Sequence, residues 1–242
     1  MVRPRAIVVR APGTNCDEET ADAWQRAGAT VESWHVNRLI DAPADLDRFQ
    51  ILTIPGGFSY GDDLGAGRIL ATRIGIVLGD ALRRFHDRGG LVLGICNGFQ
   101  ILCEAGLLPG ALMRNASQTY ICKQTFLRTE TVDSPFTHGL TKGQVLQMPI
   151  GHMEGNYFCD AETLAALKKD DRIAFRYTTP EGVVSSAANP NGSLENIAGV
   201  LNEGRNVLGM MPHPDRSSEA LLGSRDGLLL FQAMAESLAA AQ

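Results

Sequence analysis

A cysteine between two glycines has the spacing of a nucleophile held in a sharp turn. Cys96 stands two residues after Gly94 and two before Gly98, with a strand-like apolar run at residues 91–95 and a helical pattern at residues 99–105. This is the Gly-x-nucleophile-x-Gly elbow with cysteine in place of serine. The glycines would give the turn room, and the free N–H groups at the helix start would favour a thiolate. We predict that Cys96 is a nucleophile, the alternative being a buried structural cysteine.

A histidine between two prolines is the best candidate for the base. His213 is followed by Pro214 and Asp215, and prolines favour an extended backbone. In an extended segment residues i and i+2 project to the same side, so the carboxylate would orient the imidazole and favour the imidazolium. The pattern predicts a Cys96–His213–Asp215 triad, with His152 as the alternative base.

A glycine-rich loop at residues 55–67 follows a predicted strand. It lacks the Gly-Lys-Ser/Thr end of a phosphate-binding loop, and Gly65 and Gly67 have no third glycine at the G-x-G-x-x-G spacing. Open α/β sheets bind ligands at the carboxyl ends of their strands, and Cys96 ends the next predicted strand. We expect the loop to supply a second oxyanion-hole N–H group, the alternative being a flexible surface loop.

Strands and helices alternate around these residues, which predicts an α/β fold with a doubly wound, mostly parallel sheet. Between residues 107 and 188 the alternation weakens, and we expect a mixed or antiparallel elaboration there. No linker or repeat divides the chain, so we predict a single domain over residues 1–242. The predicted strands are residues 6–10, 30–36, 49–54, 91–95, 125–132, 144–148, 173–177, 197–201 and 207–211, and the predicted helices are residues 17–27, 69–85, 99–105, 162–168 and 226–240.

Composition excludes several classes of function. The net charge is −5 and no basic block occurs, which argues against nucleic acid as a partner. No run reaches the roughly 18 apolar residues of a membrane span, and the first apolar run is too short for a signal peptide. Five cysteines without C-x-x-C spacing indicate neither a disulfide framework nor a zinc site. We therefore expect no metal, no membrane and a cytoplasmic location.

The elbow, the glycine-rich loop and the histidine motif together resemble the triad-type (class I) glutamine amidotransferases, which implies a flavodoxin-like sheet with an antiparallel elaboration. Further motifs along essentially the whole chain resemble the glutaminase subunits of phosphoribosylformylglycinamidine synthases, which act in purine biosynthesis. The motifs are Gly94-Ile95-Cys96-Asn97-Gly98-Phe99-Gln100, Pro55-Gly56-Gly57, His213-Pro214-Asp215, Pro12-Gly13-Thr14-Asn15-Cys16-Asp17, Gly57-Phe58-Ser59-Tyr60-Gly61-Asp62, Gly155-Asn156-Tyr157, Asn189-Pro190-Asn191-Gly192-Ser193, Gly209-Met210-Met211-Pro212-His213-Pro214 and Gly223-Ser224-Arg225-Asp226-Gly227.

The resemblance implies hydrolysis of glutamine to glutamate and ammonia through a γ-glutamyl thioester on Cys96. The oxyanion would be met by the backbone N–H of Asn97 and by that of Gly57 or Phe58. His213 would protonate the departing ammonia and then activate water. Three residues would bind glutamine: Gln100, His152 and Glu154.

The resemblance also implies partners. Ammonia would pass to a synthetase subunit that converts formylglycinamide ribonucleotide to formylglycinamidine ribonucleotide, with ATP and Mg²⁺ bound there, and a small third subunit would bridge the two. No cofactor is expected on this chain. The alternatives are a Cys-His peptidase or esterase on the same scaffold, a glutaminase subunit serving another synthase, and a catalytically weak regulatory protein.

Two positions depart from the family pattern. Asp215 stands where the family usually carries glutamate, and the missing methylene shortens the reach by about 1.5 Å. Either the backbone after Pro214 compensates, or the contact with the histidine is longer or bridged by water. Gln118-Thr119-Tyr120 replaces a Gly-Arg-Phe-like run, so we expect different contacts there near glutamine or the partner subunit.

Overall fold

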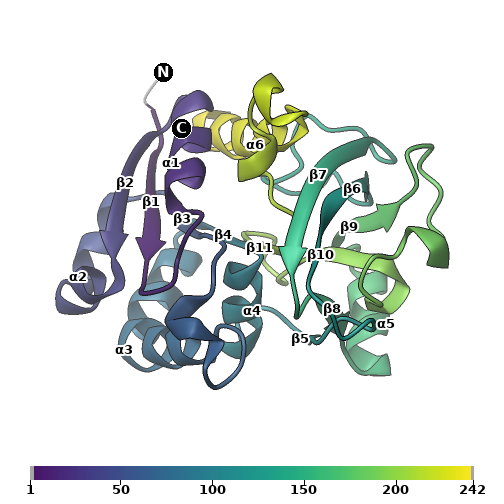
Figure 1. Cartoon of the computed structure of the whole chain (residues 1–242). Helices are drawn as coiled ribbons and strands as arrows, with labels where there is room; N and C mark the ends of the chain where they lie inside the picture. The colour runs from purple at the N-terminus through teal and green to yellow at the C-terminus, as the bar shows by residue number, and fades with distance from the viewer. Residues whose placement is uncertain (1–2, 241–242) are drawn as a thin grey trace.

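The computed structural model describes residues 3–240, with a nine-stranded mixed sheet at its centre (Figure 1). The strand order is β2-β1-β3-β4-β11-β10-β9-β6-β7. The first five strands are parallel, and the remaining strands pair antiparallel. The strands are β1 (Arg5–Arg10), β2 (Thr30–His35), β3 (Ile51–Ile54), β4 (Leu91–Ile95), β6 (Ile121–Thr129), β7 (Val145–His152), β9 (Ile173–Thr178), β10 (Ile197–Leu201) and β11 (Val207–Met210).

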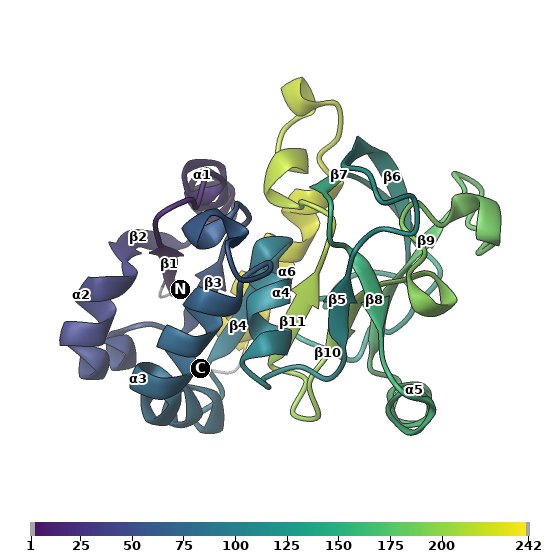
Figure 2. The same ribbon diagram turned by 60° about the horizontal axis from the view of Figure 1, so that its bottom comes forward.

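Helices cover both faces of the parallel half of the sheet. Helices α1 and α6 lie together on one face, and α3 and α4 lie on the other (Figures 1 and 2). This is the doubly wound arrangement predicted from the alternation of strands and helices. No helix within residues 3–240 has both the length and the apolar composition needed to cross a membrane. The helices are α1 (Asp17–Arg26), α2 (Val36–Asp41), α3 (Arg68–Asp87), α4 (Asn97–Glu104), α5 (Ala161–Lys169) and α6 (Asp226–Ala240).

The antiparallel half differs from the prediction in its strand limits. Strand β6 begins at Ile121 instead of residue 125, and β7 extends to His152 instead of residue 148. Residues 122–124 of β6 are all exposed, so the early part of the strand lacks the alternation that marks a half-buried strand. The short strands β5 (Ala111–Met113) and β8 (Asn156–Phe158) were not predicted, because three residues carry no periodic signal.

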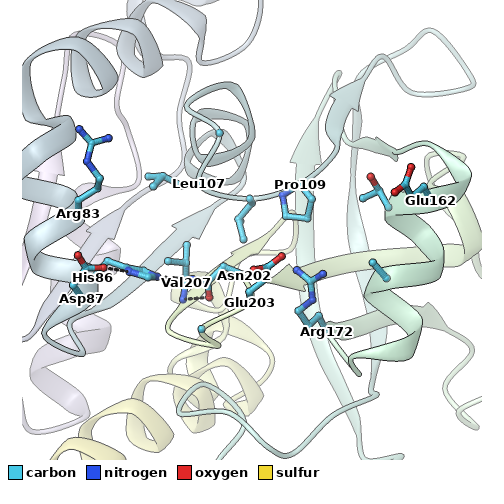
Figure 3. Close-up of a pocket in the computed structure, with 15 residues that line it drawn as sticks. Arg83, His86, Asp87, Leu107, Pro109, Glu162, Arg172, Asn202, Glu203 and Val207 are labelled. Atoms are coloured by element: carbon cyan, nitrogen blue, oxygen red, sulfur yellow. Dashed lines mark hydrogen bonds and ion pairs between the residues drawn. The ribbon is translucent and has the colours of Figure 1, made fainter.

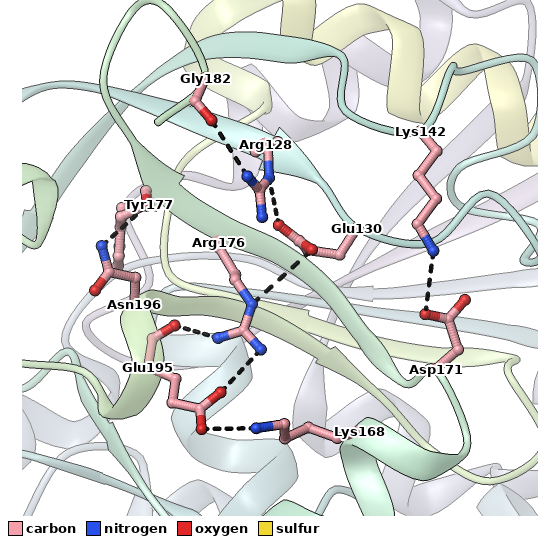
Figure 4. A network of polar contacts seen from close by, with 10 residues as sticks. All are labelled: Arg128, Glu130, Lys142, Lys168, Asp171, Arg176, Tyr177, Gly182, Glu195 and Asn196. Atoms are coloured by element: carbon pink, nitrogen blue, oxygen red, sulfur yellow. Dashed lines mark hydrogen bonds and ion pairs between the residues drawn. The ribbon is translucent and has the colours of Figure 1, made fainter. Parts of the chain in front are cut away.

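An ion-pair network fastens this half together. Arg176 on β9 lies 3.2 Å from Glu195 and 4.0 Å from Glu130, and Lys168 of α5 contacts the same Glu195 at 3.0 Å (Figure 4). Arg128 on β6 contacts Glu130 at 2.7 Å. Because these groups are partly buried and share partners, they join α5, β6 and β9 more firmly than isolated surface pairs would.

The elbow after β4 is as tight as the glycine spacing predicts. A Cβ atom on Gly98 would lie 1.9 Å from the carbonyl oxygen of Ile54 on β3, and one on Gly94 would lie 2.7 Å from the carbonyl of Gly98. The strained, positive-φ backbone conformation falls on Cys96 itself, with φ at 51° and ψ at −104°. The two glycines therefore provide space, while the cysteine carries the strain.

We expect Gly98→Ala to destabilise the protein by about 1–3 kcal/mol or more, because its Cβ would overlap the Ile54 carbonyl. Gly79→Ala in α3 is the matched control, since the nearest atoms to its Cβ are the guanidinium nitrogens of Arg83 at 3.9 and 4.0 Å. That control should stabilise the protein by about 0.5–1 kcal/mol. Urea unfolding of both variants measures the difference, and equal stabilities would show that the elbow is not crowded.

Candidate functional site

The predicted nucleophile and base follow two adjacent parallel strands. Cys96 follows β4, and its N–H donates to the carbonyl of Met210 at the end of β11 at 2.8 Å. His213 comes three residues after β11, where its N–H donates to the Pro149 carbonyl of β7 at 2.9 Å. Both side chains are buried, with residue exposures of 4% and 2%, and the thiol and the imidazole lie against each other. The sheet thus brings the two residues together at the carboxyl ends of its strands.

Asp215 lies beside His213, although not in the way that the prolines suggest. The segment is not extended: Pro214 has ψ at −29°, and a 3-10 turn follows at Asp215–Ser217. The predicted extended segment is therefore wrong, since the fixed φ of proline is also compatible with a helical turn. The turn nevertheless places the Asp215 Oδ1 atom 3.3 Å from His213 Nδ1. The contact is a long ion pair without aligned hydrogen-bond geometry.

Burial and the charge of Asp215 act in opposite directions on the protonation of His213. Burial is the largest single cause and lowers the pKa of His213, but the causes that raise it, of which the charge of Asp215 is the largest, together leave the pKa well above 6.5. Contacts with the thiols of Cys16 and Cys96 act in the same direction. At neutral pH the imidazole is therefore charged, which is the state that accompanies a thiolate nucleophile.

Cys16 is a second cysteine at this histidine, and the sequence motifs gave it no role in the chemistry. Its sulfur, a donor nitrogen of His213 and a carboxylate oxygen of Asp215 all lie within 4.8 Å of one another. The sulfur also accepts a hydrogen bond from Arg216 Nη2 at 3.1 Å. Burial is the largest cause of the raised pKa of the Cys16 thiol. One feature of the sequence could have indicated this role: Cys16 comes soon after the predicted strand at residues 6–10, so it lies at the same edge of the sheet as Cys96.

The same three groups could in principle hold a metal ion. However, the Arg216 guanidinium already contacts the Cys16 sulfur, and the imidazole of His213 carries a proton. A divalent cation would have to displace one positive group and deprotonate the other. These donors therefore suit an internal polar cluster better than a metal centre.

The backbone N–H groups of Asn97, at the start of α4, and of Gly57, in the glycine-rich loop, have no acceptor within residues 3–240. The N–H of Phe58 donates instead to the Gly13 carbonyl at 2.9 Å. Of the two loop donors considered from the sequence, Gly57 is thus the one left free. The Asn97 side chain fixes the loop by accepting from the Ser59 N–H at 3.2 Å.

The three predicted glutamine-binding residues lie near each other but already have protein partners. Gln100 donates to the Glu154 carbonyl at 2.6 Å and accepts from the Asn97 amide at 2.9 Å. His152 Nδ1 lies 3.0 Å from the Asn115 amide oxygen. Burial, with the charge of His213 second, lowers the pKa of His152 to about 4. Glu154 accepts from the Ala66 N–H at 3.4 Å. Gln100 therefore ties α4 to the turn after β7.

Tyr120 covers the β7 side of the site. Its hydroxyl lies 2.9 Å from where a Cβ on Gly151 would stand, and the Gly151 carbonyl is 3.7 Å from the Cys96 sulfur. The Tyr120 ring is half-exposed and lies 6.5 Å from the ring of Phe58 on the facing loop. The run that departs from the family pattern thus places an aromatic hydroxyl at the rim of the site.

The chain is similar to known proteins over nearly its whole length. Residues 3–226 match the model of the CobB/CobQ-like glutamine amidotransferase domain. A curated relative from Koribacter versatilis, phosphoribosylformylglycinamidine synthase subunit PurQ, is 55% identical over 233 residues, covering 94% of this chain and 96% of the relative. The protein of the same name from Salinibacter ruber is 47% identical over 232 residues, covering 94% of each chain.

Solved structures also resemble this chain. A chain of the structure of PurLQS from Thermotoga maritima superposes with a TM-score of 0.81 at 40% identity, covering 98% of this chain and 100% of that one. A glutamine amidotransferase from the same organism has a TM-score of 0.56 at 13% identity, covering 100% of this chain and 86% of that one, and so shares the fold alone. With the family model matching most of its length, this chain belongs to the CobB/CobQ-like glutamine amidotransferase family.

Proposed function

We propose that this chain is the glutaminase subunit of a phosphoribosylformylglycinamidine synthase, releasing ammonia from glutamine. The observation that carries the proposal is the elbow cysteine, Cys96, against the buried, charged His213, with the free N–H groups of Gly57 and Asn97 nearby. Relatives that bear this name match the chain over nearly its full length.

The first half of the reaction forms the acyl-enzyme. The Cys96 thiolate attacks the carboxamide carbon of glutamine, and the developing oxyanion is stabilised by the N–H groups of Gly57 and Asn97. His213 gives its proton to the nitrogen as the C–N bond breaks, so ammonia leaves and a γ-glutamyl thioester remains on Cys96. Asp215 stabilises the charged imidazole before this transfer.

The second half releases glutamate. Neutral His213 removes a proton from water, the resulting hydroxide attacks the thioester, and Cys96 leaves as thiolate while His213 keeps the proton. Gln100 positions the turn that carries Glu154, so that this turn and His152 shape the amino-acid end of the glutamine pocket.

The ammonia is used by a partner. In this proposal a synthetase subunit holds ATP and Mg²⁺ and aminates formylglycinamide ribonucleotide, and a small subunit bridges the two. The chain in the Thermotoga maritima PurLQS structure that resembles this one supports a multi-subunit assembly.

Co-purification with the synthetase and small subunits tests the proposal as a whole. With glutamine, ATP and formylglycinamide ribonucleotide, the complex should form formylglycinamidine ribonucleotide at a rate that falls to background in Cys96→Ser. Free ammonia should restore product formation in that variant, because the synthetase remains intact. Amination of a different acceptor, or binding of a different synthetase, would show that the chain serves another synthase.

Of the two cysteines at His213, only Cys96 should be essential. Cys96→Ser should lower the glutaminase kcat by about a thousandfold or more, since loss of a nucleophile removes the covalent route. Cys16→Ser, which alters the same histidine's surroundings, should stay within about tenfold of the wild type. Steady-state ammonia release measures both. A larger loss in Cys16→Ser than in Cys96→Ser would reverse the assignment.

Asp215 should hold the proton on His213. In Asp215→Asn, made in the Cys96→Ser background, the pKa of His213 should fall by about one unit or more, because the opposite charge is removed while burial remains. Asp215→Glu is the matched control and should keep the pKa raised. Histidine NMR titration measures the shift. An unchanged pKa in Asp215→Asn would mean that the carboxylate does not set the charge of this site.

A further inference from the structure

A cavity of about 830 Å³ lies at the end of the sheet opposite Cys96 (Figure 3). Its walls come from the end of α3, the segment after α4, the first turns of α5 and the turn between β10 and β11. Val207, the first residue of β11, lines it, whereas His213 comes after the last residue of that strand. The cavity is therefore separate from the proposed glutaminase site, and its volume suits a small molecule.

Arg172 lines this cavity and is buried without adequate partners. Its side chain is only 8% exposed, and its Nε atom is fully buried and has no hydrogen-bond partner among residues 3–240. The nearest acid, Asp170, lies 3.5 Å from Nη2 and is half-exposed. Figure 3 shows the guanidinium pointing from the edge of β9 toward the space bordered by Pro109 and Glu203. A buried guanidinium normally has its donors satisfied, so this one is exceptional.

Arg176, on β9 and four residues after Arg172, provides a contrast. Arg176 is about as buried, but it is held by Glu130 and Glu195 and also donates to the backbone carbonyl of Glu195. Within the described part of the chain, the guanidinium of Arg172 has only the long contact to Asp170. Because a partly paired buried charge is costly, its retention next to a cavity points to a partner that enters from outside.

The charges at the cavity restrict what that partner can be. A guanidinium binds planar or tetrahedral oxyanions through paired N–H donors. Exposed Glu162, Glu203 and Asp87 also line the cavity, and against them stands one exposed cation, Arg83. These acids would repel a ligand with several negative charges and would attract a positive group. The lining thus favours a single oxyanion on a neutral or cationic body.

We propose that this cavity is a binding site for a small ligand bearing one carboxylate or phosphate group, which pairs with the guanidinium of Arg172. The apolar residues Leu107, Leu108 and Pro109 contact the body of the ligand. A cationic group on the ligand is directed toward Glu162 or Glu203. The site is distinct from the chemistry at Cys96 and stands whether or not the proposed glutaminase function is correct.

NMR titration of the arginine Nε–H signals tests the site in the whole protein. Acetate, inorganic phosphate and γ-aminobutyrate are added separately at constant ionic strength. The Arg172 signal, assigned by its loss in Arg172→Gln, should shift saturably with acetate or phosphate, which distinguishes the carboxylate and phosphate sources. γ-Aminobutyrate should bind more tightly than acetate, because the acids at the cavity receive its ammonium group. Absence of a saturable shift with all three probes would overturn the proposal.

Two variants separate binding from a structural role. Arg172→Gln should weaken the best probe at least tenfold, as measured by calorimetry, whereas Arg84→Gln, which removes an exposed arginine outside the cavity, should not. Equal binding by Arg172→Gln and the wild type would also overturn the proposal. Arg172→Met should unfold at the same temperature as the wild type or higher in anion-free buffer, because it removes an uncompensated buried charge. A clear fall would show that Arg172 serves the fold instead.

Discussion

The backbone of α4 approaches β3 so closely at Gly98 that only glycine fits against the Ile54 carbonyl. The whole site depends on this contact. It brings the start of α4 to the carboxyl ends of the central strands, and the turn between β4 and α4 is completed by a positive φ at Cys96. The sulfur is thereby held beside the free N–H of Asn97, facing the loop that supplies the free N–H of Gly57.

Beside this elbow, a buried polar cluster keeps the imidazole of His213 positively charged. His213 and Asp215 form an ion pair with almost no exposure to solvent, and Cys16 and Arg216 lie on the same cluster. The contact of Asp215 with His213 is long, at 3.3 Å. In a buried setting even a long ion pair is weakly screened, so the carboxylate still raises the pKa of the imidazole. The negative charge of Asp215, more than a well-aligned hydrogen bond, accounts for the protonated state of His213.

The sequence was informative where local patterns decide the structure. The limits of α6 and β10 agree with those predicted from the pattern of their residues, and the tight elbow follows from glycine spacing. Features that depend on distant contacts were not predictable in this way. The turn at Pro214 depends on packing against β7, the cluster at Cys16 depends on sheet order, and the unpartnered Arg172 is recognisable only once burial is known.

The central claim is that Cys96 carries the γ-glutamyl group during glutamine hydrolysis. Acid quenching of the complete complex during turnover, followed by peptide mass spectrometry, tests it directly. The account predicts a γ-glutamyl adduct on the peptide that contains Cys96, released as the hydroxamate by hydroxylamine. Ammonia release with the adduct on the peptide that contains Cys16, or hydrolysis in Cys96→Ser at the wild-type rate, would contradict it.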